Sequence, residues 1–245
     1  MANYNAVGIL LAAGESTRMG KPKALLPWRG TTLLEYQMNS LLQGGCDKVV
    51  VVTGAYDAEM APLLKDREGV IRAYNPRYKE GKTTSVKAGI WEVPDGVHSI
   101  VLLAVDQPRP AWVIEKVLRT HTDFGAEVTS PGFDGHGGHP LVFDESLRTE
   151  LASVTEEGEG VRAIFRRPDV NHHRIQFESA IVRLDINTPE AYEEALKTYT
   201  DLAKSLTFTE WRTLPNSPWL LFHHRLATRF TMHRSIFRLL ASTDG

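Results

Sequence analysis

A short stretch near the N-terminus combines small residues, hydroxyls and cations in the way that a phosphate-binding loop requires. Its glycines, hydroxyl residues and cations are Gly14, Gly20, Ser16, Thr17, Arg18, Lys21 and Lys23. Glycines permit positive φ and a close approach of the backbone to a ligand, and neighbouring N–H groups and cations attract anions. The stretch directly follows an apolar run, which is where open α/β sheets bind their ligands. We therefore expect this loop to bind a triphosphate; the alternative is an ordinary basic turn between a strand and a helix.

Two common nucleotide-binding motifs do not describe this loop. Five residues instead of four separate Gly14 from Gly20, and Pro22 stands where a Walker A loop has the Ser or Thr that binds magnesium. A Gly-x-Gly-x-x-Ala match does occur at residues 158–163. It follows a polar helical segment instead of a strand, so we do not interpret it as a dinucleotide fingerprint.

A carboxylate stands at the end of a second apolar run. Asp106 follows residues 101–105, which should form a buried strand. A charge there is costly unless a cation or several donors compensate it. Magnesium with nucleotide phosphates is the natural partner, because this ion usually takes one or two carboxylates and keeps waters. The structural alternative for Asp106 is a cap for the helix expected to begin near Pro110.

Asp185 is the best candidate for a second metal ligand. It follows the apolar segment Ile181–Leu184, which we expect to end a strand. An equally physical alternative is that its side chain orders the turn at Asn187 and Thr188.

Three further segments carry polar groups that suit a substrate. Residues 81–85 open a predicted helix, so free N–H groups and hydroxyls gather there, although a capped helix start is the alternative. The glycine-rich loop 133–140 contains His136 and His139, which are too few for a zinc site without further ligands. We expect His139 to orient or contact an acceptor phosphate, the alternative being a structural loop. Arg162 supplies a cation for such a phosphate, or is an exposed arginine on a surface helix. We assign no metal to the pairs at 172–173 and 223–224.

Apolar runs of strand length alternate with helix-length periodic segments along residues 1–199, as a mostly parallel sheet requires. The expected strands are Ala6–Ala12, Lys48–Thr53, Val70–Tyr74, Ser99–Val105, Ala126–Ser130, Pro140–Phe143 and a strand in Arg174–Leu184. The expected helices are Thr31–Gln43, Asp57–Lys65, Thr83–Trp91, Ala111–Thr120, Glu145–Ser153, Val161–Arg166 and Pro189–Tyr199, the last capped by Thr188. This order predicts an α/β fold: a Rossmann-like three-layer αβα domain with a mostly parallel sheet.

Composition narrows the possible classes of protein. With 42% hydrophobic and 24% charged residues and a net charge of −2, the chain should fold and has no overall attraction to nucleic acid. The single cysteine, Cys46, excludes an internal disulfide and points to a reducing compartment. No apolar stretch reaches the length of a membrane-spanning helix. We expect a cytoplasmic protein.

Residues 200–245 differ from the rest of the chain. They carry six Lys or Arg and three acidic residues, and arginines recur every four or five positions among apolar ones. This pattern predicts a helical C-terminal appendage to a domain spanning residues 1–199. Three interpretations remain open: a helix packed on the domain or on a second subunit, a helix that docks a partner, and a membrane-surface helix.

The N-terminal loop, read as Leu-Ala-Ala-Gly-Glu-Ser-Thr-Arg-Met-Gly-Lys-Pro-Lys from Leu11, resembles the signature loop of the MobA-like nucleotidyltransferases. Its Ala-Ala-Gly form is most similar to the molybdenum cofactor cytidylyltransferase branch. Further matches follow in family order at Gly81–Gly89, Asp106–Pro108, Gly138–Pro140, Gly158–Arg162 and Asp185–Glu190. Together they cover about residues 6–196, and five landmarks in order are far more specific than one loop.

The resemblance implies the nucleotide-diphospho-sugar-transferase-like fold and a set of site residues. The nucleotide site would comprise Leu11, Ala12, Ala13, Gly14, Glu15, Ser16, Arg18, Lys23, Thr84, Ser85 and Asp106. Of these, Arg18, Lys23 and Asp106 would be catalytic. Asp106 and Asp185 would hold Mg²⁺, and Gln107, His139, Pro140 and Arg162 would bind the acceptor.

The activity that the resemblance implies is transfer of NMP from an NTP, with CTP ahead of GTP, to molybdopterin or its molybdenum-loaded form. One rival keeps the chemistry and changes the acceptor to a sugar phosphate or an alcohol phosphate. A rival of another class is a non-catalytic cofactor chaperone that uses residues 200–245 to dock onto a molybdoenzyme client.

Overall fold

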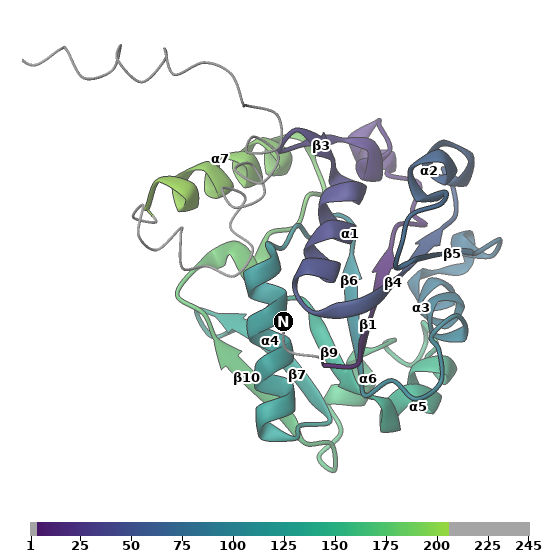
Figure 1. Cartoon of the computed structure of the whole chain (residues 1–245), viewed down its shortest axis with the longest axis vertical. Helices are drawn as coiled ribbons and strands as arrows, with labels where there is room; N and C mark the ends of the chain where they lie inside the picture. The colour runs from purple at the N-terminus through teal and green to yellow at the C-terminus, as the bar shows by residue number, and fades with distance from the viewer. Residues whose placement is uncertain (1–3, 206–245) are drawn as a thin grey trace, which may run out of the picture. The chain divides into compact units, whose positions relative to one another are not determined.

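A mixed β-sheet forms the centre of the part of the chain that the computed structural model describes, residues 4–205 (Figure 1). The strand order is β10-β7-β9-β6-β1-β4-β5, with β8 paired to β7. The strands are β1 Ala6–Leu11, β4 Cys46–Thr53, β5 Val70–Tyr74, β6 Ser99–Ala104, β7 Val128–Phe133, β8 His136–Gly137, β9 Leu141–Asp144 and β10 His172–Gln176. Neighbours from β5 to β6 run parallel, whereas β9 runs antiparallel to both β6 and β7. A separate two-stranded hairpin joins β2 Pro27–Trp28 to β3 Thr31–Thr32.

Helices cover both faces of the sheet, which confirms the predicted Rossmann-like αβα architecture (Figure 1). The helices are α1 Leu33–Gln43, α2 Asp57–Leu64, α3 Lys82–Trp91, α4 Ala111–Phe124, α5 Arg148–Ser153, α6 Arg162–Phe165 and α7 Pro189–Ser205. Short 3-10 turns are η1 Thr17–Met19, η2 Lys23–Leu25, η3 Tyr78–Glu80, η4 Glu145–Leu147 and η5 Ala180–Arg183. Within residues 4–205, no helix is both long and apolar enough to cross a membrane.

Close packing on β1 fixes the two layers of helices. All six residues of β1 are buried, and alternate side chains point to opposite faces of the sheet. A Cβ added to Gly89 of α3 would lie 2.5 Å from Ile9 Cγ2, so this position lets α3 approach one face. On the other face, a Cβ at Gly8 would lie 3.2 Å from the methyl groups of Leu41 in α1. The sheet therefore has a core on each side, and its strand ends face the connecting loops.

Local chemistry sets the helix ends that the sequence predicted. The hydroxyl of Thr32 accepts from the Glu35 N–H and the Glu35 carboxylate accepts from the Thr32 N–H, a capping box that starts α1. Thr188 caps α7 as expected, because its hydroxyl accepts a hydrogen bond of 3.2 Å from the Ala191 N–H. Helix α7 runs to Ser205, past its predicted end near Tyr199. The predictions for the tail beyond Ser205 fall outside the described residues.

The prediction of a strand running into Ile181–Leu184 was wrong. Strand β10 ends at Gln176, and the apolar segment folds as the 3-10 turn η5, in which Ile181 and Val182 are buried. The side chain of Ser179 accepts from the Ile181 N–H at 3.3 Å and starts this turn. A short apolar run is compatible with a strand or a buried turn, and periodicity alone does not separate them. Asp185 therefore follows a turn, not a strand.

Candidate active site

The carboxyl ends of two parallel strands bring the N-terminal loop and Asp106 together. Leu11 at the end of β1 pairs with Ala104 at the end of β6. Lys23 Nζ lies 2.8 Å from Asp106 Oδ2 and also donates to Asn187 Oδ1 at 2.7 Å. The three side chains come from segments before α1, before α4 and before α7. This charged cluster is the centre of the site.

The backbone of the loop is shaped to receive an anion. Ser16 and Gly20 adopt the left-handed conformation, with φ of 53° and 63°. The Ser16 hydroxyl accepts from the Lys23 N–H at 3.0 Å, and the Tyr56 hydroxyl donates to the Glu15 carbonyl at 2.9 Å. Within the described part of the chain, the N–H groups of Gly14, Glu15 and Ser16 have no hydrogen-bond acceptor. Consecutive free N–H groups of this kind make an anion-binding concavity.

Asp185 lies near Asp106 because the chain after η5 returns to β6. The Ile186 N–H donates to the Asp106 carbonyl at 2.8 Å. Burial raises the pKa of Asp185, and the negative charge of Asp106 raises it further, against the opposing effect of Lys23. Two neighbouring carboxylates that disfavour each other's charge gain stability from a cation placed between them.

The donor set fits Mg²⁺ and does not fit a zinc site. Mg²⁺ usually binds one or two carboxylates and completes its shell with waters and phosphates, which Asp106 and Asp185 permit. Among the described residues, no group of three or more His, Cys, Asp or Glu could hold a metal ion. His136 is exposed and donates from Nδ1 to the Asp134 carbonyl at 2.6 Å, so it takes no part in the site.

Two adjoining cavities open beside the charged cluster. The loop cavity, of about 370 Å³, follows the loop after β1 and also contacts Tyr56 and Tyr78. The large cavity, of about 890 Å³, extends over the sheet toward α6 and β10. Leu11, Lys82 and Ala104 line both cavities. A ligand in the loop cavity is thus within reach of a ligand in the large one.

Most of the residues expected to bind nucleotide line the loop cavity. They are Leu11, Ala12, Ala13, Gly14, Glu15, Ser16, Lys23, Ser85 and Asp106. Arg18 is exposed outside this lining, where its Nη2 lies 3.5 Å from Asn187 Oδ1. Thr84 also lies outside it, because its hydroxyl bonds to the Gly81 carbonyl at 2.8 Å and accepts from Asn75 at 2.9 Å. These hydrogen bonds hold the Thr84 hydroxyl at the start of α3.

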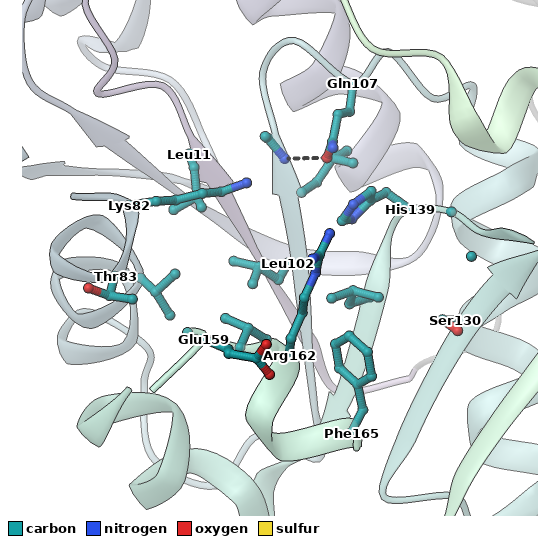
Figure 2. A pocket seen from close by; sticks show the side chains of 18 of the residues that line it. Leu11, Lys82, Thr83, Leu102, Gln107, Ser130, His139, Glu159, Arg162 and Phe165 are labelled. Carbon is teal, nitrogen blue, oxygen red and sulfur yellow. Dashed lines mark hydrogen bonds between the residues drawn. The ribbon is translucent and has the colours of Figure 1, made fainter. Parts of the chain in front are cut away.

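The residues expected to bind the acceptor gather around the large cavity. Gln107, His139 and Arg162 line it together with Asp185, whereas Pro140 is buried and does not. Arg162 extends from α6 toward His139 (Figure 2). It is also exposed to solvent, as the surface-arginine alternative requires, and its contact with an acceptor phosphate stays a prediction. Asp106 does not cap α4, whose start at Pro110 has no side-chain cap.

Acids and cations both line the large cavity, but among residues 4–205 two of its cations are not paired with an acid. Within the described residues, neither Lys82 nor Arg162 has a carboxylate at ion-pair distance. Burial, followed by the charges of Arg109, Lys82 and Arg162, lowers the pKa of His139 to about 3. His139 is therefore neutral at physiological pH and can accept or donate one hydrogen bond. The cavity is suited to an anionic ligand.

Arg109 is a structural element of the site that sequence reasoning missed. Its guanidinium is fully buried and donates to the carbonyls of His139 at 2.8 Å, Val182 at 2.7 Å and Leu184 at 3.0 Å, and to its neighbour Pro108 at 2.7 Å. Burial lowers the pKa of Arg109 to about 10, so the group stays charged. Arg109 thus joins the His139 loop to the turn before Asp185. A charged residue between two prolines resembles a surface turn, so no signal in the sequence marked it.

Lys82 and Asn187 are the other residues that the geometry adds. Lys82 opens α3 and lines both cavities, and Asn187 accepts from Lys23. Both stood inside segments already singled out from the sequence. Their individual contacts depend on how those segments meet.

Comparison with known proteins agrees with the family resemblance of the sequence. A family model described as the MobA-like NTP transferase domain matches residues 8–175. A nicotine blue oxidoreductase of Paenarthrobacter nicotinovorans is 34% identical over 65% of this chain and 81% of its own length. The molybdenum cofactor cytidylyltransferase of Escherichia coli is 28% identical over 79% and 97%. A probable molybdenum cofactor guanylyltransferase of Bacillus cereus is 40% identical over 78% and 95%.

A solved structure shares the fold. Rv0371C of Mycobacterium tuberculosis, in complex with manganese, is 26% identical, with a TM-score of 0.63. The match covers 78% of this chain and 98% of that chain. The shared fold therefore covers most of this chain.

Proposed function

This chain belongs to the MobA-like NTP transferase family, and we propose that it transfers NMP, with CMP favoured, from an NTP to the phosphate of molybdopterin or its molybdenum-loaded form. A phosphate oxygen of the acceptor attacks the α-phosphorus of the NTP. The bond between the α- and β-phosphates breaks, and pyrophosphate leaves. The Escherichia coli relative named molybdenum cofactor cytidylyltransferase supports this acceptor and this base.

The observation that carries the proposal is the position of the charged cluster. Lys23 and Asp106 lie in the loop cavity, which has free N–H groups for phosphates, and Asp185 lies in the adjoining large cavity. Two substrates placed in these cavities meet beside the two carboxylates. Positioning and charge neutralisation supply most of the catalysis in phosphoryl-type transfers, and no covalent nucleophile is required.

Each side chain has a role in this reaction. Lys23, whose side chain is 11% exposed, neutralises charge that develops on the triphosphate, and the N–H groups of Gly14 to Ser16 hold phosphate oxygens. Arg18 supports the triphosphate from the exposed side of the loop. Asp106 and Asp185 would hold Mg²⁺, which supplies charge neutralisation to the phosphates when bound. The manganese complex of the structural relative supports a divalent ion in this fold.

The acceptor phosphate is proposed to lie between Lys82 and Arg162. These two cations have no acid partner among the described residues and face the cavity that adjoins the loop. His139 is neutral there and donates a hydrogen bond without adding charge. Gln107 contributes its amide, with Oε1 already accepting from the Ala104 N–H at 3.4 Å.

Pyrophosphate release tests the proposal. Purified protein, Mg²⁺ and molybdopterin are assayed with CTP, GTP and ATP side by side, with Asp106→Ala as the control for the site. We expect release with CTP that the substitution abolishes. Release with GTP instead would assign the guanylyltransferase activity named for the Bacillus cereus relative. Release with no nucleotide would contradict the proposal and leave sugar phosphates, alcohol phosphates or a cofactor chaperone.

Three further proposals concern the cellular setting. We propose a cytoplasmic location, which rests on the free thiol of Cys46, buried in the structure. We also propose that the extension expected at residues 200–245, whose first six residues continue α7, forms an appendage that docks a molybdoenzyme client. Co-purification with an apo-enzyme that is lost on deleting residues 206–245, and kept in Asp106→Ala, would support the client.

A further inference from the structure

The large cavity is too extensive for a phosphate group alone. Cavities of this volume, about 890 Å³, take whole drug-sized ligands. Lys82 and Thr83 lie at one end of it, and Phe165 and Ser130 lie on the opposite side (Figure 2). We call the part lined by Ser130, Phe165, His172 and Arg174 the far end of the cavity.

A polar strand face and an aromatic ring build the far end. His172 and Arg174 are two residues apart on β10, so they share one face, and Arg174 pairs in register with Ser130 of β7. Ser130 Oγ lies 2.9 Å from His172 Nε2. The ring of Phe165, from α6, has its centre 5.5 Å from that of His172. Elements distant in sequence thus place one ring and three polar groups together.

The chemistry of the far end differs from that of a phosphate site. Burial, followed by the charge of Arg174, lowers the pKa of His172, so its ring is neutral and both accepts and donates. Ser130 is buried and its hydroxyl does the same. Among the described residues Arg174 has no carboxylate at ion-pair distance, and its guanidinium offers donors to a carbonyl or ring nitrogen. An aromatic face beside neutral donors and acceptors suits a planar ring with a polar edge.

We propose that the far end binds a heteroaromatic ring of the acceptor, with Phe165 packed on the face of the ring and Ser130, His172 and Arg174 bonded to its polar edge. The inference rests on the proposed function, in which the acceptor joins a pterin ring to the phosphate that reacts. The phosphate lies at the Lys82 end and the ring at the far end. The far end thereby selects the acceptor by its ring and leaves the nucleotide site unaffected.

A purely structural role for the same residues makes a different prediction. The hydrogen bond between Ser130 and His172 joins β7 to β10, so these residues could serve only to hold the strands together. In that case substitutions would lower thermal stability and leave ligand affinity unchanged. Phe165 and Arg174 take no part in that hydrogen bond. Substitutions of these two residues therefore distinguish ligand binding from a purely structural role.

Adjacent residues on β10 provide matched controls. His173 stacks on Phe124 with ring centres 4.2 Å apart, and Phe124 does not line the cavity. Phe124→Leu therefore removes an aromatic ring beside the same strand without touching the far end. His173→Asn is the matching control for His172→Asn.

Direct binding of a pterin without phosphate is the first measurement. The probe is 6-hydroxymethylpterin, titrated with protein and followed by quenching of its own fluorescence. We expect saturable binding to the wild type, and a dissociation constant about tenfold higher for Phe165→Leu and for Arg174→Ala. Phe124→Leu and His173→Asn should match the wild type. No binding to the wild type, or equal affinity in all variants, overturns the inference.

Steady-state kinetics separate this inference from the proposed function. With molybdopterin as acceptor, Phe165→Leu should raise the acceptor KM about tenfold and change the NTP KM and kcat by less than about twofold. An unchanged acceptor KM in an active enzyme would overturn the inference while the proposed function stands. If the wild type binds the pterin and transfers nothing to molybdopterin, ring binding at the far end is supported and the proposed function is contradicted.

Discussion

The cation at the centre of the loop cavity is paired with an acid, whereas in the described part of the chain two cations of the large cavity are not. In the loop cavity, Lys23 is already paired with Asp106 and bonded to Asn187 before any ligand binds. In the large cavity, Lys82 and Arg162 have no acid partner within the described residues, and the histidine beside them is neutral. The loop cavity is therefore held in shape by its own charges, and in the proposed function these charges exchange partners when a triphosphate binds. In the large cavity, Lys82 and Arg162 stay available to a ligand.

The largest expected effect tests the loop cavity, in which Lys23 is paired with Asp106. Lys23→Ala should lower kcat for pyrophosphate release by about 10²- to 10³-fold, because a preorganised charge that stabilises the transition state contributes about 2.7–4 kcal/mol. The fold should persist, as measured by circular dichroism. Lys21→Ala is the matched control, since Lys21 is a loop cation that does not line the cavity. Near wild-type turnover in Lys23→Ala would remove Lys23 from the mechanism.

The next effect concerns the buried Arg109, which joins the His139 loop to the turn before Asp185. Arg109→Met removes a buried guanidinium and leaves carbonyls of His139, Val182 and Leu184 without a donor. The free energy of unfolding should fall by about 2–4 kcal/mol, measured by urea denaturation.

Arg119→Met is the control for Arg109, because Arg119 is exposed and, within residues 4–205, forms an ion pair with Glu115 alone, one turn away on α4. It should change the free energy of unfolding by less than about 0.5 kcal/mol. Equal stability of the two variants would show that the buried guanidinium does not hold the His139 loop to the turn before Asp185.

A smaller effect tests the large cavity, through its unpaired cation Arg162. Arg162→Ala should raise the acceptor KM about tenfold and leave the NTP KM unchanged, because Arg162 faces only the large cavity. Arg166 lines the same cavity but is 2.5 Å from Glu159, so Arg166→Ala should have a weaker effect on the acceptor KM. The opposite order would show that pairing with an acid does not decide which cations bind the acceptor.

The smallest effect is a dependence of stability on pH. Burial lowers the pKa of His139 and of His121, whose Nδ1 lies 3.0 Å from Thr129 Oγ1. Below the ordinary histidine pKa of about 6.5, the unfolded chain binds protons that the folded chain excludes, so the unfolding free energy falls as pH drops from there. The melting temperature should decrease from pH 7.5 to 5.5, and His139→Gln should lessen the decrease. An identical decrease in the variant would show that His139 titrates normally.

Local patterns predicted most of the fold because they act over a few residues. Alternating apolar runs placed β5 at Val70–Tyr74, and α3 within one residue of its observed start. The failure at Ile181–Leu184 has the same origin, since a short apolar run buries itself equally well as a strand or as a 3-10 turn. Most of the residues that line the loop cavity could be named from the sequence because the small residues, hydroxyls and cations of this loop are contiguous.

Local patterns along the chain were enough to predict the layered α/β fold, the loop after the first strand and the carboxylate at the end of a buried strand. Each of these depends on neighbours along the chain. The packing of distant segments brings Lys23 to Asp106, 83 residues away, and to Asn187, 164 residues away. It also decided that Arg109 is buried among carbonyls from three segments, and that Phe165 faces Ser130 and His172 across one cavity. Such contacts arise where strand ends and returning loops converge, and spacing along the chain carries no record of that convergence.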